Sequence, residues 1–230
     1  MQYLNYFKNK LQHLLLRPIR VFVFHQTSAE FDASTMWSCD WTEISAFKNR
    51  ILNLRKDYTF ISLQDAAYHL KNDKIRSSRY AVLTADDGWK SVLNILPWLS
   101  EQNIPLTLFL NPCYLDDVHK QERDTEQLLT YDEIREILSK YPSVSIASHG
   151  WDHKKCLEMS DLDFEENIEK ANNILIQFKG FIPFYAFTFG AHTPYQVKIL
   201  HHHHLIPVLV DGMQNYAGTE VIHRECIDNS

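Results

Sequence analysis

Short apolar runs alternate along the chain with segments in which an apolar residue recurs every three or four positions. The runs predict strands that are buried on both faces, and the recurring positions predict helices with one buried face. Ser62 and Thr130 each stand three positions before an acidic residue, a pattern that begins helices. We expect strands at 21–24, 58–61, 79–84, 105–110, 143–147, 184–188, 206–210 and 220–223, and helices at 42–55, from 62, and at 89–102, 130–140, 164–178 and 195–203.

Strands that alternate with helices along a whole chain favour a parallel sheet covered by helices. The 230 residues suffice for one large hydrophobic core. A closed or nearly closed barrel fits this length better than an open sheet, although the pattern by itself is compatible with both. We therefore expect a single α/β domain at 20–230, preceded by a helical extension at 1–19.

The extension has an amphipathic pattern, with Leu4, Phe7, Leu11 and Leu14 at helical spacing and lysines between them. We favour packing of this helix against the domain, and contact with a membrane surface is the alternative. Its longest apolar run is too short for a secretion signal, and no apolar stretch of the sequence is long enough for a membrane span. We expect a cytoplasmic protein. It is either free in the cytoplasm or in peripheral contact with the inner membrane face through residues 1–17.

The composition is that of an ordinary soluble domain, with 45% apolar and 23% charged residues. The net charge of −6 argues against a nucleic-acid partner. The cysteines at 39, 113, 156 and 226 form no C-x-x-C pair and are expected to be buried thiols. The histidine run at 201–204 lies on a predicted helix, so its side chains diverge, and we expect them in solvent rather than around one metal ion.

Polar residues of the types that bind metals or transfer protons follow most of the predicted strands. In α/β barrels the working groups lie at the carboxyl ends of the strands, so residues far apart in sequence can meet there. Asp211 is followed by glycine, and for this residue we favour a role in opening a turn. The residues that follow strands are His25, Asp86, Asp87, Asn111, His149, His153, Thr188, Asp211 and His223.

Two histidines and two carboxylates in this set fit a metal site. His149 and His153 are four residues apart, which places both imidazoles on one face of a helical turn. In a chain with 12 histidines such a pair alone is more often structural. Asp86 and Asp87 follow another strand, however, and two histidines with one carboxylate are a usual ligand set for catalytic zinc. A metal also explains adjacent aspartates, because coordination neutralises one and the other stays free as a base.

The stretch Thr84-Ala85-Asp86-Asp87-Gly88 resembles T-F-D-D-G, a motif of the polysaccharide deacetylases of carbohydrate esterase family 4. His149-Gly150-Trp151-Asp152-His153 resembles the H-[ST]-x-x-H motif of the same family. The segment 105–110 between them resembles the family's P-A-T-F-F strand, and 185–190 resembles the F-A-Y-P-Y-G form of the third motif. The similarity runs from about residue 21 to near the end of the chain.

The resemblance implies a distorted (β/α)7 barrel that hydrolyses N-acetyl, or in some members O-acetyl, groups on sugars. It implies that Asp86 is the catalytic base and that Asp87, His149 and His153 bind one divalent transition metal ion, most often zinc. The family's general acid comes from an L-x-H motif, which 221–223 matches loosely, so His223 takes that role. The implied partner is an acetylated amino sugar in a polymer or in a nucleotide-linked or lipid-linked precursor.

Several positions depart from the family pattern. The arginine of the third motif, which steadies the catalytic aspartate, has no counterpart at 184–186. Ala85 stands where the family has phenylalanine, and Gly150 stands where it has serine or threonine. The stretch around His223 also matches an I-P-R pattern of family variants, which would transfer the functional role to Arg224 and leave His223 incidental. Between these two we favour His223 slightly.

Four residues are candidates for contact with the substrate. Family variants carry a histidine at the position of His25, which suggests a role in the pocket, and a capped histidine at the strand end is the equal alternative. Trp89 and Trp151 could stack on a sugar ring, with core packing as the alternative for each. Arg224 joins this set through the I-P-R pattern, and a backbone N–H in 111–114 is expected to bind the oxyanion.

Two other functions are compatible with these features. A barrel that keeps the metal and binds carbohydrate without turnover would explain the missing arginine, but such a protein has no use for the free base Asp86. A deacylase for another acyl group, such as a formamide on a lipid-linked sugar, would keep the whole site and change only the substrate.

Overall fold

The computed structural model describes residues 17–28, 41–72, 78–115 and 127–227. Most of the predicted helical extension, and also Cys39, lie outside the described residues. The last part of the extension, 17–19, is not helical. Instead, the N–H of Ile19 donates to the carbonyl of Asn215 at 2.9 Å in an isolated β-bridge. Ile19 is fully buried, so this part of the chain already belongs to the barrel.

Seven parallel strands form a closed barrel, which confirms the predicted distorted (β/α)7 fold in a single domain. Their order around the barrel is β1-β10-β9-β8-β7-β6-β5, and β5 pairs with β1 to close the ring. A short strand, β4, pairs with the start of β5. The strands are β1 (Arg20–Phe24), β4 (Thr59–Phe60), β5 (Tyr80–Ala85), β6 (Leu106–Leu110), β7 (Val144–Ser148), β8 (Phe181–Ala186), β9 (Ile206–Val210) and β10 (Ile222–Cys226).

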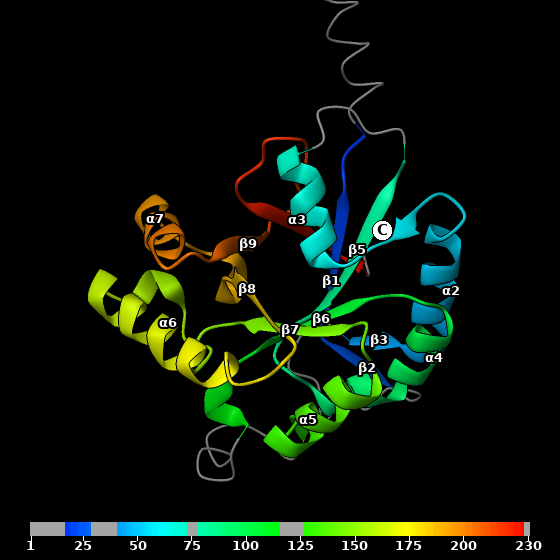
Figure 1. The fold of residues 1–230 in the computed structure, drawn as a ribbon, viewed down its shortest axis with the longest axis horizontal. Helices are drawn as coiled ribbons and strands as arrows, with labels where there is room; N and C mark the ends of the chain where they lie inside the picture. Colours follow the sequence, from blue (N-terminus) through cyan, green and yellow to red (C-terminus); the bar gives the residue numbers. More distant parts are fainter. Residues whose placement is uncertain (1–16, 29–40, 73–77, 116–126, 228–230) are drawn as a thin grey trace, which may run out of the picture.

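Helices surround the barrel, with α6 and α7 on one side and α2 and α4 on the opposite side (Figure 1). The predicted capping box is present, because the Thr130 hydroxyl accepts from the N–H of Glu133 at 3.2 Å and the Glu133 carboxylate accepts from the N–H of Thr130 at 2.7 Å. The α-helices are α2 (Ile44–Leu54), α3 (Leu63–Asn72), α4 (Leu96–Glu101), α5 (Tyr131–Lys140), α6 (Asp161–Leu175) and α7 (Pro194–His202), and the 3-10 helices are η1 (Lys90–Asn94), η2 (Pro112–Tyr114), η5 (Cys156–Glu158) and η6 (Thr188–Gly190). None of the described helices is long and apolar enough to cross a membrane.

Three elements differ from those predicted, and prolines are involved in two of these differences. The single helix expected at 89–102 is split into η1 and α4, because the ring of Pro97 is incompatible with a continuous α-helix through the preceding turn. Strand β8 begins three residues earlier than expected, at Phe181. Its exposed Pro183 is tolerated because the pairing of β7 with β8 shifts register between Ile146 and Ser148. The last strand lies at 222–226 rather than 220–223.

A small parallel pair, β2 (Gln26–Ser28) and β3 (Trp41–Glu43), was not predicted. Each strand has only three residues, too few for a period-two pattern to be visible in the sequence. The pair follows the carboxyl end of β1. Thr27 anchors it to η1, because its N–H donates to the hydroxyl of Ser91 at 3.1 Å and its own hydroxyl donates to the Ser91 carbonyl at 3.0 Å. It therefore lies at the same end of the barrel as the residues that follow the strands.

The barrel interior is a packed core. One hydrophobic cluster takes at least one buried residue from every strand of the ring, and α3 packs against it. A second, larger cluster fills the space between the strands and α2, α4 and α5. The interior residues from the seven strands include Val21, Val82, Phe109, Ala147, Phe184, Val208 and Ile222.

Candidate active site

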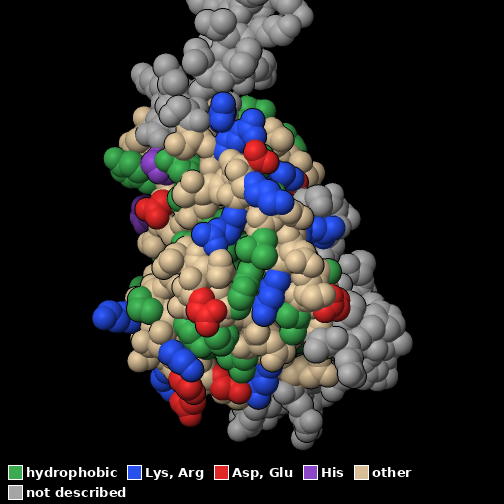
Figure 2. Space-filling view, turned by 90° about the vertical axis from the view of Figure 1, so that its right-hand side faces the viewer, with side chains coloured by type: hydrophobic (Ala, Val, Ile, Leu, Met, Phe, Trp, Pro, Cys, Tyr) green, Lys and Arg blue, Asp and Glu red, His purple; other side chains and the backbone are tan. Residues whose placement is uncertain are grey.

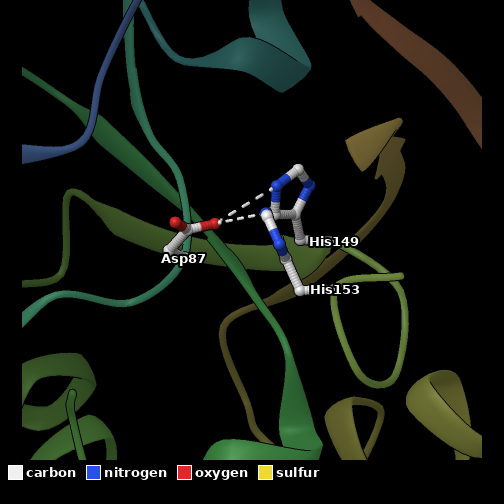
Figure 3. Close-up of side chains that lie close together, drawn as sticks. All are labelled: Asp87, His149 and His153. Carbon is white, nitrogen blue, oxygen red and sulfur yellow. Dashed lines mark ion pairs between the residues drawn. The ribbon is translucent and has the colours of Figure 1, made fainter. Parts of the chain in front are cut away.

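Asp87, His149 and His153 converge at the carboxyl ends of β5 and β7 (Figure 3). The Asp87 Oδ1 atom lies 3.0 Å from Nε2 of His153 and 3.4 Å from Nε2 of His149. One ligand atom from each residue lies within 4.8 Å of the others, which is the spacing of groups that share an ion. Among the described residues these form a cluster that could hold a metal, and the sequence had singled out all of them.

The backbone that brings the two histidines together is a loop, so the predicted helical turn is wrong. His149 directly follows β7, and the chain then turns through Gly150, with φ of +78°, to His153, with φ of +55°. Asp87 also has a positive φ, of +68°. Non-glycine residues adopt this region at an energetic cost and tend to do so at functional sites, where the surrounding structure holds them.

Two asparagines hold this loop from either side. Asn111, which follows β6, donates through Nδ2 to the carbonyl oxygens of His149 and Gly150. Asn167 of α6 accepts the N–H of Trp151 at 2.8 Å, and its Nδ2 donates to the Asp152 carboxylate at 2.9 Å. The sequence had not pointed to Asn167, although a polar residue within the buried stripe of α6 was a visible signal.

The same packing explains why glycine stands at position 150. A Cβ atom there would lie 2.9 Å from Oδ1 of Asn167 and 3.0 Å from the hydroxyl of Tyr185. Both atoms are too close for a side chain, and the positive φ adds strain for any other residue. The departure from serine or threonine is thus coupled to Asn167 and Tyr185.

The proton arrangement of His149 fits a metal ligand. Its Nδ1 atom lies 2.8 Å from the carbonyl oxygen of Ala186, so Nδ1–H donates and the Nε2 lone pair faces Asp87. A lone pair opposite a carboxylate requires a cation, either a proton on the imidazole or a metal ion. Burial would lower the pKa of His149, but the carboxylates of Asp86 and Asp87 raise it above its ordinary value. Burial would raise the pKa of Asp87, but His149 and His153 hold it well below its usual range.

Asp86 is held by Arg224 of β10. The two guanidinium nitrogens lie 2.6 and 2.7 Å from the two carboxylate oxygens, and Arg224 also donates to Thr84 at 3.1 Å. Arg224 is fully buried, with its guanidinium carbon 5.0 Å from the centre of the Phe109 ring. Burial would raise the pKa of Asp86, but Arg224 and His149 lower it, so this carboxylate is ionised. Arg224 makes the contact that the missing arginine of the third motif would make.

His223 is not brought to this site. Successive side chains of a strand point to opposite faces, so His223 points away from the face that carries Arg224. Its Nδ1 atom lies 2.7 Å from the Asp211 carboxylate, and its N–H donates to Oδ1 of Asn215. Asp211 also accepts the N–H of Met213 at 3.0 Å, as expected for a residue that opens a turn. His223 is thus paired with Asp211 and not with Asp86, and its role as the general acid stays a prediction.

His25 lies beside Asp86. It directly follows β1, and the N–H of Asp86 donates to the carbonyl of the preceding residue, Phe24, at 3.1 Å. The charge of His25 contributes to the low pKa of Asp86, after the effects of burial, Arg224 and His149. The structure thus brings His25, rather than His223, to the side of Asp86 at the mouth of the barrel.

The two tryptophans differ in exposure. Trp89 is buried in a cluster with Cys113, Tyr114 and Leu128, and its Nε1–H donates to Oδ2 of Asp87 at 3.3 Å. It therefore orients the carboxylate of Asp87, and its burial favours core packing, the alternative to stacking on a sugar. Trp151 packs against the cluster but is only half-buried, so part of its ring remains accessible.

The structure changes one further expectation, the oxyanion donor in 111–114, and adds an aromatic residue that the sequence had not indicated. The N–H groups of Cys113 and Tyr114 donate to backbone carbonyls, and Pro112 has none, so these three positions offer no oxyanion donor. Phe189, whose ring is 63% exposed, lies with its ring centre 4.8 Å from that of His153. Its φ of +57° holds an exposed aromatic ring at the rim of the site.

Among the described residues, neither the histidine run nor a cysteine belongs to the metal-ligand cluster. His201, His202 and His204 are exposed, as predicted, whereas His203 is half-buried with Nε2 2.8 Å from the Glu165 carboxylate. The three described cysteines are free thiols, with Cys113 and Cys156 buried and Cys226 half-buried.

Comparison with known proteins agrees with this geometry. The family model "Polysaccharide deacetylase" matches residues 73–206. The Streptococcus pyogenes deacetylase PplD, solved in complex with acetate, has 15% sequence identity and a TM-score of 0.76 over 92% of each chain. IcaB from Ammonifex degensii has 17% identity and a TM-score of 0.74 over 91% of each chain. A de-N-acetylase from Aggregatibacter actinomycetemcomitans has 16% identity and a TM-score of 0.71 over 90% of this chain and 94% of that one.

At such identities the structural similarity establishes the fold. None of the curated proteins that were compared matches the chain.

Proposed function

Because the chain belongs to the polysaccharide deacetylase family, we propose that it is a metal-dependent hydrolase that removes an acetyl group from an amino sugar. The observation that carries this proposal is the different environment of two adjacent carboxylates. Asp87 faces two imidazole nitrogens, whereas both oxygens of Asp86 are bound by Arg224. One carboxylate is thus suited to bind an ion and the other to act as a base.

A divalent transition ion held by Asp87, His149 and His153, in our proposal zinc, would supply Lewis-acid activation of water and of the acetyl carbonyl. Asp86 accepts the proton of the attacking water. Its low pKa keeps it ionised, and Arg224, which Thr84 holds in turn, fixes its orientation. Trp89 and the carbonyl of Ala186 hold Asp87 and His149 in place. The loss of the amine then requires a proton donor on the leaving-group side.

We assign this proton donor to His25. It leaves the end of β1 next to Asp86, and it is half-buried, so it can reach a bound substrate. In the amide hydrolysis, the proton that His25 donates goes to the departing nitrogen, and His25 is reprotonated from solvent. Phe189 and the accessible part of Trp151 border the site and offer apolar surfaces to the sugar ring.

Replacing His25 by alanine is expected to lower turnover of an N-acetyl sugar by about 10²–10⁴-fold, because an amine is a poor leaving group without a proton. His223→Ala, a matched change at the other candidate histidine, is expected to leave turnover near the wild-type value. Steady-state kinetics of the two metal-loaded variants measures both effects.

A substrate with a leaving group that needs no proton separates this role from a structural one. The His25→Ala variant should keep most of its activity on 4-nitrophenyl acetate, and its metal content should equal that of the wild type. A large loss in His223→Ala with little effect in His25→Ala would instead make His223 the general acid.

The function is tested by incubating the metal-loaded protein with N-acetylglucosamine oligomers and related acetamido sugars and measuring free acetate. We expect acetate release that a chelator abolishes and that added zinc restores. Sugar binding without release would identify a carbohydrate-binding barrel, and formate release from a formamido sugar would identify a different acyl group. The cytoplasmic location expected from the sequence stays a prediction.

A further inference from the structure

We propose that a basic face at one end of the barrel docks this protein on an anionic membrane surface. This is the end at which the strands begin, opposite the metal ligands. The inference rests on the charges and exposure of this face and does not depend on the reaction. The basic face comprises Arg17, Arg20, Arg55, Lys56 and Arg79.

Contacts and chain position place these residues in one region around Tyr58, and Arg17 precedes Arg20 by three residues. The guanidinium carbon of Arg20 lies 5.7 Å from the centre of the Tyr58 ring. The carbonyl of Arg79 accepts the N–H of Thr59 at 2.9 Å, next to Tyr58. Arg55 and Lys56 follow the end of α2, and only Asp57 separates them from Tyr58. Figure 2 shows this side of the molecule, and Lys and Arg side chains outnumber acidic ones in its upper half.

The face is positive although the chain is negative. Asp57, Glu101 and Glu225 lie in or beside it, so five cations stand against three carboxylates while the whole chain has a net charge of −6. Arg20 forms a close ion pair with Glu225, and Arg79 lies 3.5 Å from Asp57. Charge of one sign gathered on one face attracts a surface of the other sign.

The two cations at the end of α2 contact neutral partners. Arg55 donates to the side-chain oxygen of Gln102, and Lys56 donates to that of Asn53 at 2.8 Å. Both side chains are exposed, and neither of these contacts neutralises its charge. Their charge is therefore available to an anionic partner.

Two observations favour a membrane over a nucleic acid. Leu52, on α2 next to these cations, is 43% exposed, and phospholipid surfaces take up apolar side chains beside basic ones. The sequence that leads into Arg17, residues 1–16, has apolar residues at helical spacing, two lysines and no acidic residue. The basic face is thus continuous in sequence with a segment of the composition that peripheral membrane proteins use.

The orientation has a consequence for the substrate. Arg20 and Arg79 lie at or next to the starts of β1 and β5, whereas His25 and Asp87 follow the ends of the same strands. A protein docked through the basic face therefore holds its catalytic site on the side away from the membrane. It would reach sugars that extend into the aqueous phase.

The test is sedimentation of the full chain with phosphatidylcholine vesicles with or without phosphatidylglycerol. We expect binding only to the anionic vesicles, lost at high salt. The variant R55E/K56E should bind about tenfold or more weakly, because each basic residue near such a surface contributes roughly fivefold. The matched control K170E/K198E makes the same charge change at exposed positions of α6 and α7, on the opposite side of the barrel, and should bind like the wild type.

Equal weakening in both double variants would overturn the proposal, because net charge alone would then control binding. Equal binding to both kinds of vesicle, or no binding to either, would also overturn it. Tighter binding of a single-stranded DNA oligomer with the same dependence on Arg55 and Lys56 would make the face a nucleic-acid site. Circular dichroism checks that each variant is folded, and R79E, at another exposed position of the face, provides a second test with the same expected direction.

Discussion

Asp86→Asn is expected to lower turnover by about 10²–10⁴-fold while the metal content stays at the wild-type level, because this variant removes the general base and leaves all three ligands in place. Both oxygens of Asp86 contact Arg224, and its closest approach to His149 is 3.9 Å. Elemental analysis and steady-state kinetics on the same preparation measure the two quantities.

Asp87→Asn is the matched change at the neighbouring position and should have the opposite pattern. A neutral amide is a poor ligand beside two imidazoles, so the affinity for the metal falls. Excess zinc is expected to restore part of the activity of this variant and none of that of Asp86→Asn. The assignment of base and ligand would be refuted by equal metal loss in both variants with recovery of both on adding zinc.

Arg224→Met is expected to destabilise the fold by about 3–5 kcal/mol, since it leaves the carboxylate of Asp86 buried without its partner. Turnover should fall as well, because the base loses the group that orients it. Arg224→Lys retains the charge but cannot bind both carboxylate oxygens in the same geometry, so an intermediate effect is expected. Denaturant unfolding and kinetics of the three proteins provide the measurements.

Arg20→Met is the control for this change. Arg20 also forms a two-bond pair, with Glu225 at 2.6 Å for both bonds, but the side chains are 21% and 24% exposed. Solvent screens this pair, so its loss should cost about 1 kcal/mol or less. A similar loss in the free energy of unfolding for Arg20→Met and Arg224→Met would show that burial does not raise the contribution of the Asp86–Arg224 pair to stability.

The sequence was sufficient for the order and type of most elements. Strands buried on both faces are apolar at nearly every position, and helices on a barrel surface have one apolar stripe, so both patterns are local. The pairs Asp86–Asp87 and His149–His153 were also visible, because ligands that follow strands lie in short motifs. Short pieces such as β2 and β3 were missed because three residues carry no period.

Closure of the barrel was decided by the tertiary structure, because the apolar pattern of a parallel strand is the same in an open sheet. The partner of Asp86 is another case: Arg224 is 138 residues away, and only the pairing of β10 with β1 brings it to the carboxylate. The face on which His223 lies depends on strand register, and a shift of one residue exchanges it with Arg224.

Whether His25 or His223 lies beside Asp86 therefore could not be determined from the motifs alone. The local sequence determined which residue types follow each strand, since the apolar period of a strand and the polar residues at its end are properties of neighbouring positions. The tertiary structure decided which of those residues meet, because strand order, register and barrel closure set distances between residues that are far apart in the chain.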